Sequence, residues 1–191
     1  MKHAFYTTLA ILVLLTSFAS AQTKYTIKSQ KIEVVGTSNL HDWTATVGKV
    51  SGSTDFKVDN NAIVGITSAV VDIDANSLVG SKGSIMDNKI KDTFESEKYP
   101  RIKFALAKVN SIQTAGNVST INIVGNVTIR TVTIPVEFVV KATTLPNGDI
   151  EVRSSKKLKM TDFSLKPPTA MLGALKTAND VTVNIYFVLK K

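Results

Sequence analysis

The sequence contains no cysteine, and this absence excludes several kinds of chemistry at once. Disulfide bonds, thiolate metal ligands and cysteine nucleophiles are all ruled out. Histidine is almost as scarce, because only His3 and His41 occur in 191 residues, and His3 lies in a leader described below. A His/Cys metal site therefore cannot be assembled in one mature chain, and carboxylates alone would form a weak, oxygen-lined site. We predict no metal ligands.

Recognisable catalytic motifs are also missing. The sequence has neither a G-x-S-x-G elbow nor a glycine-rich phosphate loop. A Ser-His-Asp triad would have to use His41, but its neighbour Asp42 should point to the opposite face of a strand and cannot easily orient the imidazole. Carboxylate pairs such as Asp72 and Asp74 have spacings that project to solvent, without the burial that acid–base catalysis needs. We predict no catalytic residues and a protein that is not an enzyme.

Long hydrophobic runs are confined to the N-terminus. Lys2 precedes an apolar run from Ala4 to Phe18, and the small residues Ala19 and Ala21 flank Ser20 as in a cleavage site. The run is shorter than the roughly 20 apolar residues of a membrane-spanning helix. We predict a cleaved signal peptide over residues 1–21, one mature domain over residues 22–191, and a periplasmic or secreted protein.

Charge of one sign is not concentrated anywhere. The net charge is +8, and the lysines and arginines are scattered along the chain rather than clustered with aromatic residues. Nucleic-acid binding is therefore not expected. The positive charge indicates solubility and, at most, peripheral contact with the anionic headgroups of a membrane.

What the sequence does contain is alternation of apolar and polar residues, which is typical of β-strands. Apolar residues of one parity run from Ile121 to Ile129, and those of the opposite parity run from Val132 to Val140. The parity changes at Arg130-Thr131, so we expect a turn or bulge there. About eight or nine such strands, each with one apolar face, predict an all-β domain that forms a sandwich or a closed barrel around one interior.

Two stretches interrupt the alternation. Met86, Ile90 and Phe94 recur every four residues and form the narrow apolar stripe of a short helix, which Pro100 prevents from continuing. Ser84 and Asp87 have the spacing of a capping box, with Ser84 as the N-cap. The second stretch, residues 166–175, predicts one helical turn or an irregular loop. The first stretch could be a lid over the mouth of a barrel or a plug in one end of a packed core, and its pattern alone does not decide between them.

Three motifs in the order found in one family give the chain a recognisable resemblance. They are DNKIKDTF followed by KYPRIKF (residues 87–94 and 98–104), GNVTIRTVTIPV (residues 125–136), and DFSL before DVTV (residues 162–165 and 180–183). The chain resembles the YceI family of periplasmic, polyisoprenoid-binding, lipocalin-like proteins. Thr131 differs from the glycine that is usual in the second motif, so the turn has to form without a residue that adopts a positive φ freely.

The resemblance implies an extended, eight-stranded antiparallel lipocalin-like barrel with one short helix. It implies non-catalytic binding and carriage of a long-chain isoprenoid or similar fatty amphiphile, with a bound isoprenoid lipid or quinone rather than a cofactor, and often a homodimer. Two alternatives stay open: a small enzyme that uses the barrel as a dry pocket, and a stress-related structural protein with a filled core. We predict the following ligand-binding residues, with the last two at the polar end: Met86, Ile90, Phe94, Phe104, Phe138, Phe163, His41 and Arg130.

Overall fold

A computed structural model describes residues 22–191, so the predicted signal peptide lies outside the described residues. Residues 22–191 form eleven strands, one α-helix and three short 3-10 helices. The strands are β1 (Gln22–Ser38), β2 (Asp42–Val47), β3 (Val50–Asp59), β4 (Ala62–Asp74), β5 (Leu78–Gly80), β6 (Arg101–Ala115), β7 (Val118–Ile129), β8 (Val132–Thr144), β9 (Ile150–Lys159), β10 (Thr169–Ala170) and β11 (Leu175–Lys190). The helices are η1 (Ala75–Ser77), α1 (Ser84–Phe94), η2 (Met160–Phe163) and η3 (Met171–Gly173).

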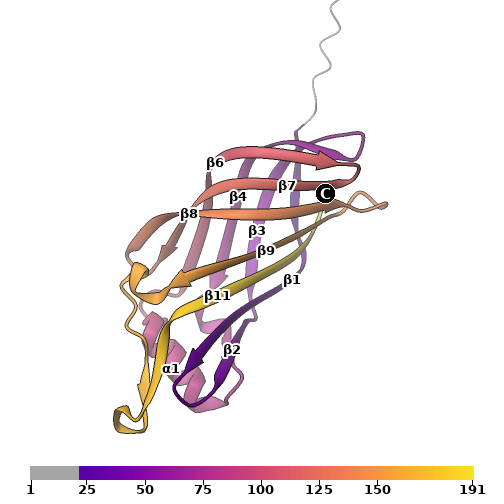
Figure 1. Cartoon of the computed structure of the whole chain (residues 1–191). Helices are drawn as coiled ribbons and strands as arrows, with labels where there is room; N and C mark the ends of the chain where they lie inside the picture. The colour runs from indigo at the N-terminus through magenta and orange to yellow at the C-terminus, as the bar shows by residue number, and fades with distance from the viewer. Residues whose placement is uncertain (1–21) are drawn as a thin grey trace, which may run out of the picture.

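The strands form one antiparallel sheet that closes on itself, because β11 pairs with β1. The wall is an eight-stranded barrel, and it confirms the predicted fold class. Three short strands, β2, β5 and β10, pair onto this wall and lengthen one end of it (Figure 1). Closure leaves the wall without the unpaired edge that an open sheet would expose.

The hairpin turns follow from local sequence. Asn60 and Asn61 join β3 to β4 with φ angles of 47° and 64°, and asparagine tolerates this left-handed conformation well. The turn between β7 and β8 consists of Arg130 and Thr131, which confirms the predicted change of parity. Arg130 adopts the left-handed conformation with φ 55°, whereas Thr131 does not have a positive φ. The turn therefore forms without a glycine at position 131.

β1 is 17 residues long and pairs with three other strands. Its first residues pair with β3, its last residues pair with β2, and most of its other edge pairs with β11. This strand therefore connects the barrel to the extension at one end, which β2 and β5 form beyond the end of β3.

The barrel is filled at one end and hollow towards the other. At the filled end Tyr25 packs edge-on against Phe56, with the ring centroids 5.5 Å apart. Ile63, Ile121 and Ile150 are completely buried beside them. Burial raises the pKa of the Tyr25 hydroxyl, and the nearby carboxylate of Asp149 raises it further.

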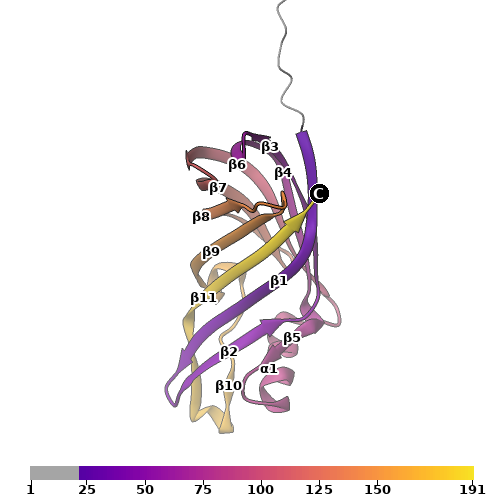
Figure 2. The same cartoon turned by 90° about the vertical axis from the view of Figure 1, so that its right-hand side faces the viewer.

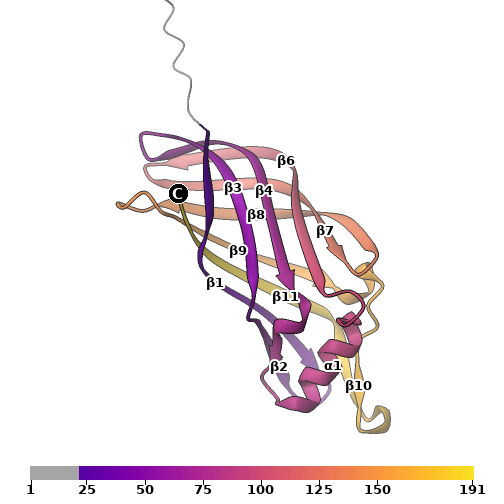
Figure 3. The same ribbon diagram turned by 180° about the vertical axis from the view of Figure 1, so that it is seen from behind.

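The helix α1 contains the predicted stripe and ends before Pro100, but the predicted capping box is wrong. Gly83, not Ser84, is the N-cap residue, and no side chain caps this end. The carboxylate of Asp87 accepts a hydrogen bond of 2.7 Å from the backbone N–H of Gly80 in β5, so it ties the helix to the extension instead. Seen from behind, α1 lies beyond the end of β4 and beside β2 (Figure 3).

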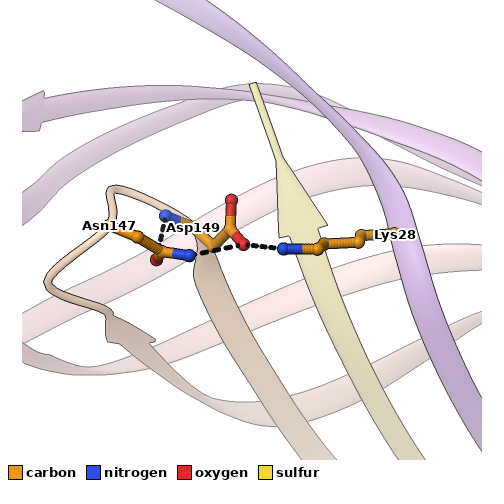
Figure 4. Close-up of polar contacts among 3 residues, drawn as sticks. All are labelled: Lys28, Asn147 and Asp149. Carbon is orange, nitrogen blue, oxygen red and sulfur yellow. Dashed lines mark hydrogen bonds and ion pairs between the residues drawn. The ribbon is translucent and has the colours of Figure 1, made fainter.

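A polar cluster holds the β8–β9 turn to β1, on the other side of β11. The Nζ atom of Lys28 in β1 lies 2.7 Å from Oδ2 of Asp149, and the amide of Asn147 donates to the same oxygen at 3.0 Å (Figure 4). The Lys28 hydrogen bond, helped by Asn147, holds the pKa of Asp149 below its ordinary value although burial opposes the shift. The cluster therefore links β1 to this turn across β11.

We expect Asp149→Asn to lower the melting temperature at pH 7 by a few degrees Celsius. Because the pKa of Asp149 is depressed in the folded state, its contribution to stability is complete above the unfolded pKa of about 3.9. That contribution disappears as the pH falls through the folded pKa, so the difference between the two proteins should shrink in acid. Denaturant unfolding from pH 7 to pH 3 measures it. Asp59→Asn, at an exposed end of β3, is the control; equal pH profiles for all three proteins would contradict the prediction.

Candidate functional site

A cavity of about 540 Å³ occupies the interior between the filled end and α1. This volume lies within the range of small-molecule binding sites, about 300–1,000 Å³. Its wall is the inward face of the barrel strands, and apolar side chains predominate there. The predicted alternation supplies this wall, including Ile121 and Ile129 of β7 and Phe138 and Val140 of β8.

Several inward side chains are only half-buried, although they occupy the same face as buried ones. In β11, Val183 and Ile185 are half-buried, whereas Phe187, two residues further on, is buried. Alternation gives all three the same face of the sheet. All three residues line the cavity, and the first two stay partly exposed to it although they pack against the core, so the interior is a hollow tube rather than a solid plug.

The helix α1 covers the cavity with the stripe that the sequence predicts. Met86, Ile90 and Phe94 all line the cavity, and none of them is fully buried. Met86 lies directly on Gly80 of β5, where an added Cβ atom would lie 2.6 Å from its Cγ and Sδ atoms. The outer side of the helix carries exposed charged residues such as Lys91 and Asp92. This arrangement is that of a lid with a narrow apolar underside.

Three predicted phenylalanines also line the cavity. Phe104 of β6 and Phe138 of β8 meet edge-on, with ring centroids 5.7 Å apart. Phe163 of η2 is almost completely buried and forms part of the same lining. The Phe104 ring lies over Gly125 of β7, where a Cβ atom would come within 1.9 Å of the ring. Only glycine leaves room for this ring position.

Polar residues are concentrated at the mouth of the cavity. His41, Lys82 and Lys89 line it there and are exposed. Trp43, which sequence analysis does not assign to the site, is half-buried at the mouth, and its Nε1–H donates to the carbonyl of Thr37 at 3.1 Å. The cavity is thus predominantly apolar along its length, and its exposed histidine and two exposed lysines lie where it opens.

Arg130 does not line this cavity. It lines a separate depression of about 330 Å³ beside the C-terminal end of α1, and this depression shares Lys89, Thr93, Pro168 and Thr169 with the cavity mouth. Arg130 forms an ion pair with Glu95, and its guanidinium carbon lies 5.7 Å from the centre of the Tyr99 ring. Its Nε atom is buried without a hydrogen-bond partner. The structure therefore brings seven of the eight predicted site residues together and places Arg130 next to them.

Residues 22–191 contain neither a cluster of possible metal ligands nor a membrane-spanning helix. This part of the chain has no group of three or more histidine or acidic residues that could hold a metal ion. None of the helices in it combines the length and the apolar character needed to cross a membrane.

A model of the YceI-like domain matches residues 21–189, which is most of the sequence. The chain belongs to the YceI-like domain family. The YceI resemblance inferred from the three sequence motifs is therefore confirmed. A search of curated proteins found no match.

Solved structures share the YceI-like fold at low sequence identity. A polyisoprenoid-binding domain from Saccharophagus degradans has a TM-score of 0.68 and 15% identity, over 89% of this chain and 99% of that one. Burkholderia cenocepacia BcnA has a TM-score of 0.60 and 21% identity, over 83% of this chain and 95% of that one. The Campylobacter jejuni YceI protein has a TM-score of 0.59 and 21% identity, over 77% and 84%. These similarities support the same barrel architecture.

We expect Gly125→Ala to reduce the capacity of the cavity. The new methyl group would force the Phe104 ring inward, and overpacking of this kind costs about 1–3 kcal/mol of stability. Titration with a fluorescent long-chain probe should show affinity several-fold weaker than that of the unaltered protein. Gly65→Ala is the matched control, because its Cβ atom would meet only the flexible side chain of Lys57. Unchanged probe affinity in Gly125→Ala would show that Phe104 does not limit the cavity.

Proposed function

We propose that the protein binds one long apolar chain, of an isoprenoid or a similar amphiphilic lipid, inside the barrel and carries it without chemical change. The observation that supports this most is the hollow interior: a cavity of about 540 Å³ lined by apolar side chains. Each methylene group moved from water into such a cavity contributes about 0.8 kcal/mol. Ten of them would contribute roughly 8 kcal/mol without any specific polar contact.

The distribution of polar residues gives the bound molecule an orientation. Its apolar chain would extend towards the filled end, and its polar group would remain at the mouth near His41, Lys82 and Lys89. An anionic or hydrogen-bonding head group suits this mouth, because two lysines can pair with it while it stays partly hydrated. Arg130, in the adjoining depression, lies close enough to the mouth to contribute to the same end through the shared residues Lys89 and Thr93.

Membership of the YceI-like domain family and the likeness to a polyisoprenoid-binding domain support binding rather than catalysis. The surroundings of His41 agree with this proposal. Within residues 22–191 no hydrogen bond to the His41 side chain is present, so nothing there orients the imidazole as a catalytic base requires. We also propose that the protein works outside the cytoplasm, in the periplasm or after secretion, as the N-terminal sequence predicts.

The direct test is extraction of the purified protein with organic solvent, followed by mass spectrometry, and then titration of the emptied protein with polyprenols. A long-chain lipid at near-equimolar yield, or saturable uptake of an added polyprenol, is the expected result. Repeated absence of both would reject the proposal.

We expect Val183→Trp to block the cavity. Val183 points into the middle of it from β11, and the larger ring would occupy the path of the chain. Polyprenol binding should fall at least about ten-fold, which corresponds to roughly 1.4 kcal/mol. Thr182→Trp is the matched control, because the adjacent residue points away from the interior. Equal loss of binding in both variants would indicate a general fault in folding rather than a blocked cavity.

A further inference from the structure

Four large apolar side chains are exposed around the mouth of the cavity. Leu40 is 65% exposed, Ile85 73% and Met171 70%, and Leu172 is fully exposed at 109%. They come from three separate segments: the β1–β2 turn, the first turn of α1, and η3. Isolated exposed apolar residues are ordinary, but a group of them around one opening is typical of an interaction surface.

These segments are held together at one tip of the molecule. Asn39 in the β1–β2 turn accepts a hydrogen bond of 2.8 Å from the backbone of Lys176 and donates one of 2.8 Å to the carbonyl of Ala174. Ser81, just before α1, exchanges hydrogen bonds with the backbone of Thr44 in β2. All three segments lie at the end opposite the C-terminus (Figure 2). The four side chains therefore form one surface, which we call the apolar tip.

The backbone of η3 is strained at its two exposed apolar residues. Met171 and Leu172 have φ angles of 52° and 53°, a left-handed conformation that residues with large side chains rarely adopt. Leu172 combines this unfavourable backbone conformation with a fully exposed apolar side chain, and each of the two raises the free energy of the folded state. Strain of this kind, kept at a surface, points to a function for the exposed side chain.

The charges around the apolar tip are mostly positive. Lys82, Lys89, Lys166 and Lys176 are exposed, and in the described part of the chain none of them forms an ion pair. The carboxylates nearby are Asp42, Asp87, Asp92 and Glu95. Asp87 accepts from the Gly80 N–H and Glu95 pairs with Arg130, so Asp42 and Asp92 remain against the four lysines. A second copy of this surface would bring like charges together, whereas an anionic lipid surface complements both the lysines and the apolar side chains.

We propose that the apolar tip docks on an anionic membrane surface and presents the cavity mouth to the bilayer. Leu40, Ile85, Met171 and Leu172 would enter the headgroup region, and the four lysines would face lipid phosphates. The route of a bound chain would then run from the bilayer under α1 into the barrel, without passing through water. This proposal goes beyond binding in the cavity, and it can fail while cavity binding stands.

The test is flotation of the full mature protein with vesicles of phosphatidylcholine alone and of phosphatidylcholine mixed with phosphatidylglycerol. We expect binding to the mixed vesicles at low salt, and at least about ten-fold weaker binding to the neutral vesicles or at high salt. No flotation with mixed vesicles at low salt would overturn the proposal.

The variant with both Leu40→Asn and Leu172→Asn removes half of the apolar tip without touching the cavity lining, since neither leucine lines it. Asparagine accepts the left-handed conformation at position 172, so the thermal stability should not fall. Vesicle binding should decrease at least about five-fold. Val139→Asn, which removes a 60%-exposed side chain from the outer wall of β8, is the matched control and should bind as the unaltered protein does.

Two further measurements separate the explanations. Polyprenol uptake from detergent should be the same in the double variant as in the unaltered protein. If neither protein takes up polyprenol, the cavity proposal is rejected and the docking proposal is not affected. Light scattering should show the same mass for the unaltered protein and the double variant. A dimer that disappears in the double variant, together with vesicle binding that does not change, would assign the apolar tip to a second copy of the chain and overturn membrane docking.

Discussion

Closure of the sheet between β1 and β11 is the constraint on which the rest of the structure depends. Their ladder runs from Thr26 and Lys190 to Ser38 and Thr177, along almost the whole length of both strands. It gives every wall strand two neighbours, so the apolar faces converge on one enclosed space instead of spreading over an open surface. The interior, its lid and its mouth all exist because this last pairing forms.

The two ends of the barrel use the same alternation for different purposes. At one end the inward residues are large enough to meet, as Tyr25 and Phe56 do, and they form a dry core. Towards the other end the inward residues of β11 and β4, such as Val183 and Ile73, line the cavity. A stable fold and an accommodating interior are therefore separated along one axis, and neither weakens the other.

Alternation predicts which side chains face inward, because the period of two fixes the face of each residue in a strand. It therefore gave Ile121 and Phe138 an apolar, inward face, and the spacing of Met86, Ile90 and Phe94 gave the apolar stripe of α1 without deciding between a lid and a plug. Period alone does not choose a strand's partners, so the double pairing of β1 and the closing ladder could not be predicted from it.

Two details differ from the sequence-based expectation, the position of Arg130 and the cap of α1, and each has an identifiable structural cause. Arg130 was expected at the polar end, but it adopts a left-handed conformation in a two-residue turn, and its side chain is held by Glu95 and Tyr99. Ser84 has the residue type and spacing of a cap, yet it is the first residue of the helix, Gly83 is the N-cap, and Asp87 bonds to β5. For Arg130 the deciding contacts are with a segment distant in the sequence, and for Asp87 the contact is with β5, which precedes the helix. The residue pattern of the turn or of the helix alone carries neither contact.

The helix α1 contains no buried residue, although three of its apolar side chains face inward. In an ordinary globular protein such side chains would be covered by other parts of the same chain. Under the proposed function, the missing cover would be the bound chain, which would act as the final piece of the hydrophobic core. Occupancy of the barrel and rigidity of the helix would then be one equilibrium, because the same contacts would hold both the bound chain and the helix.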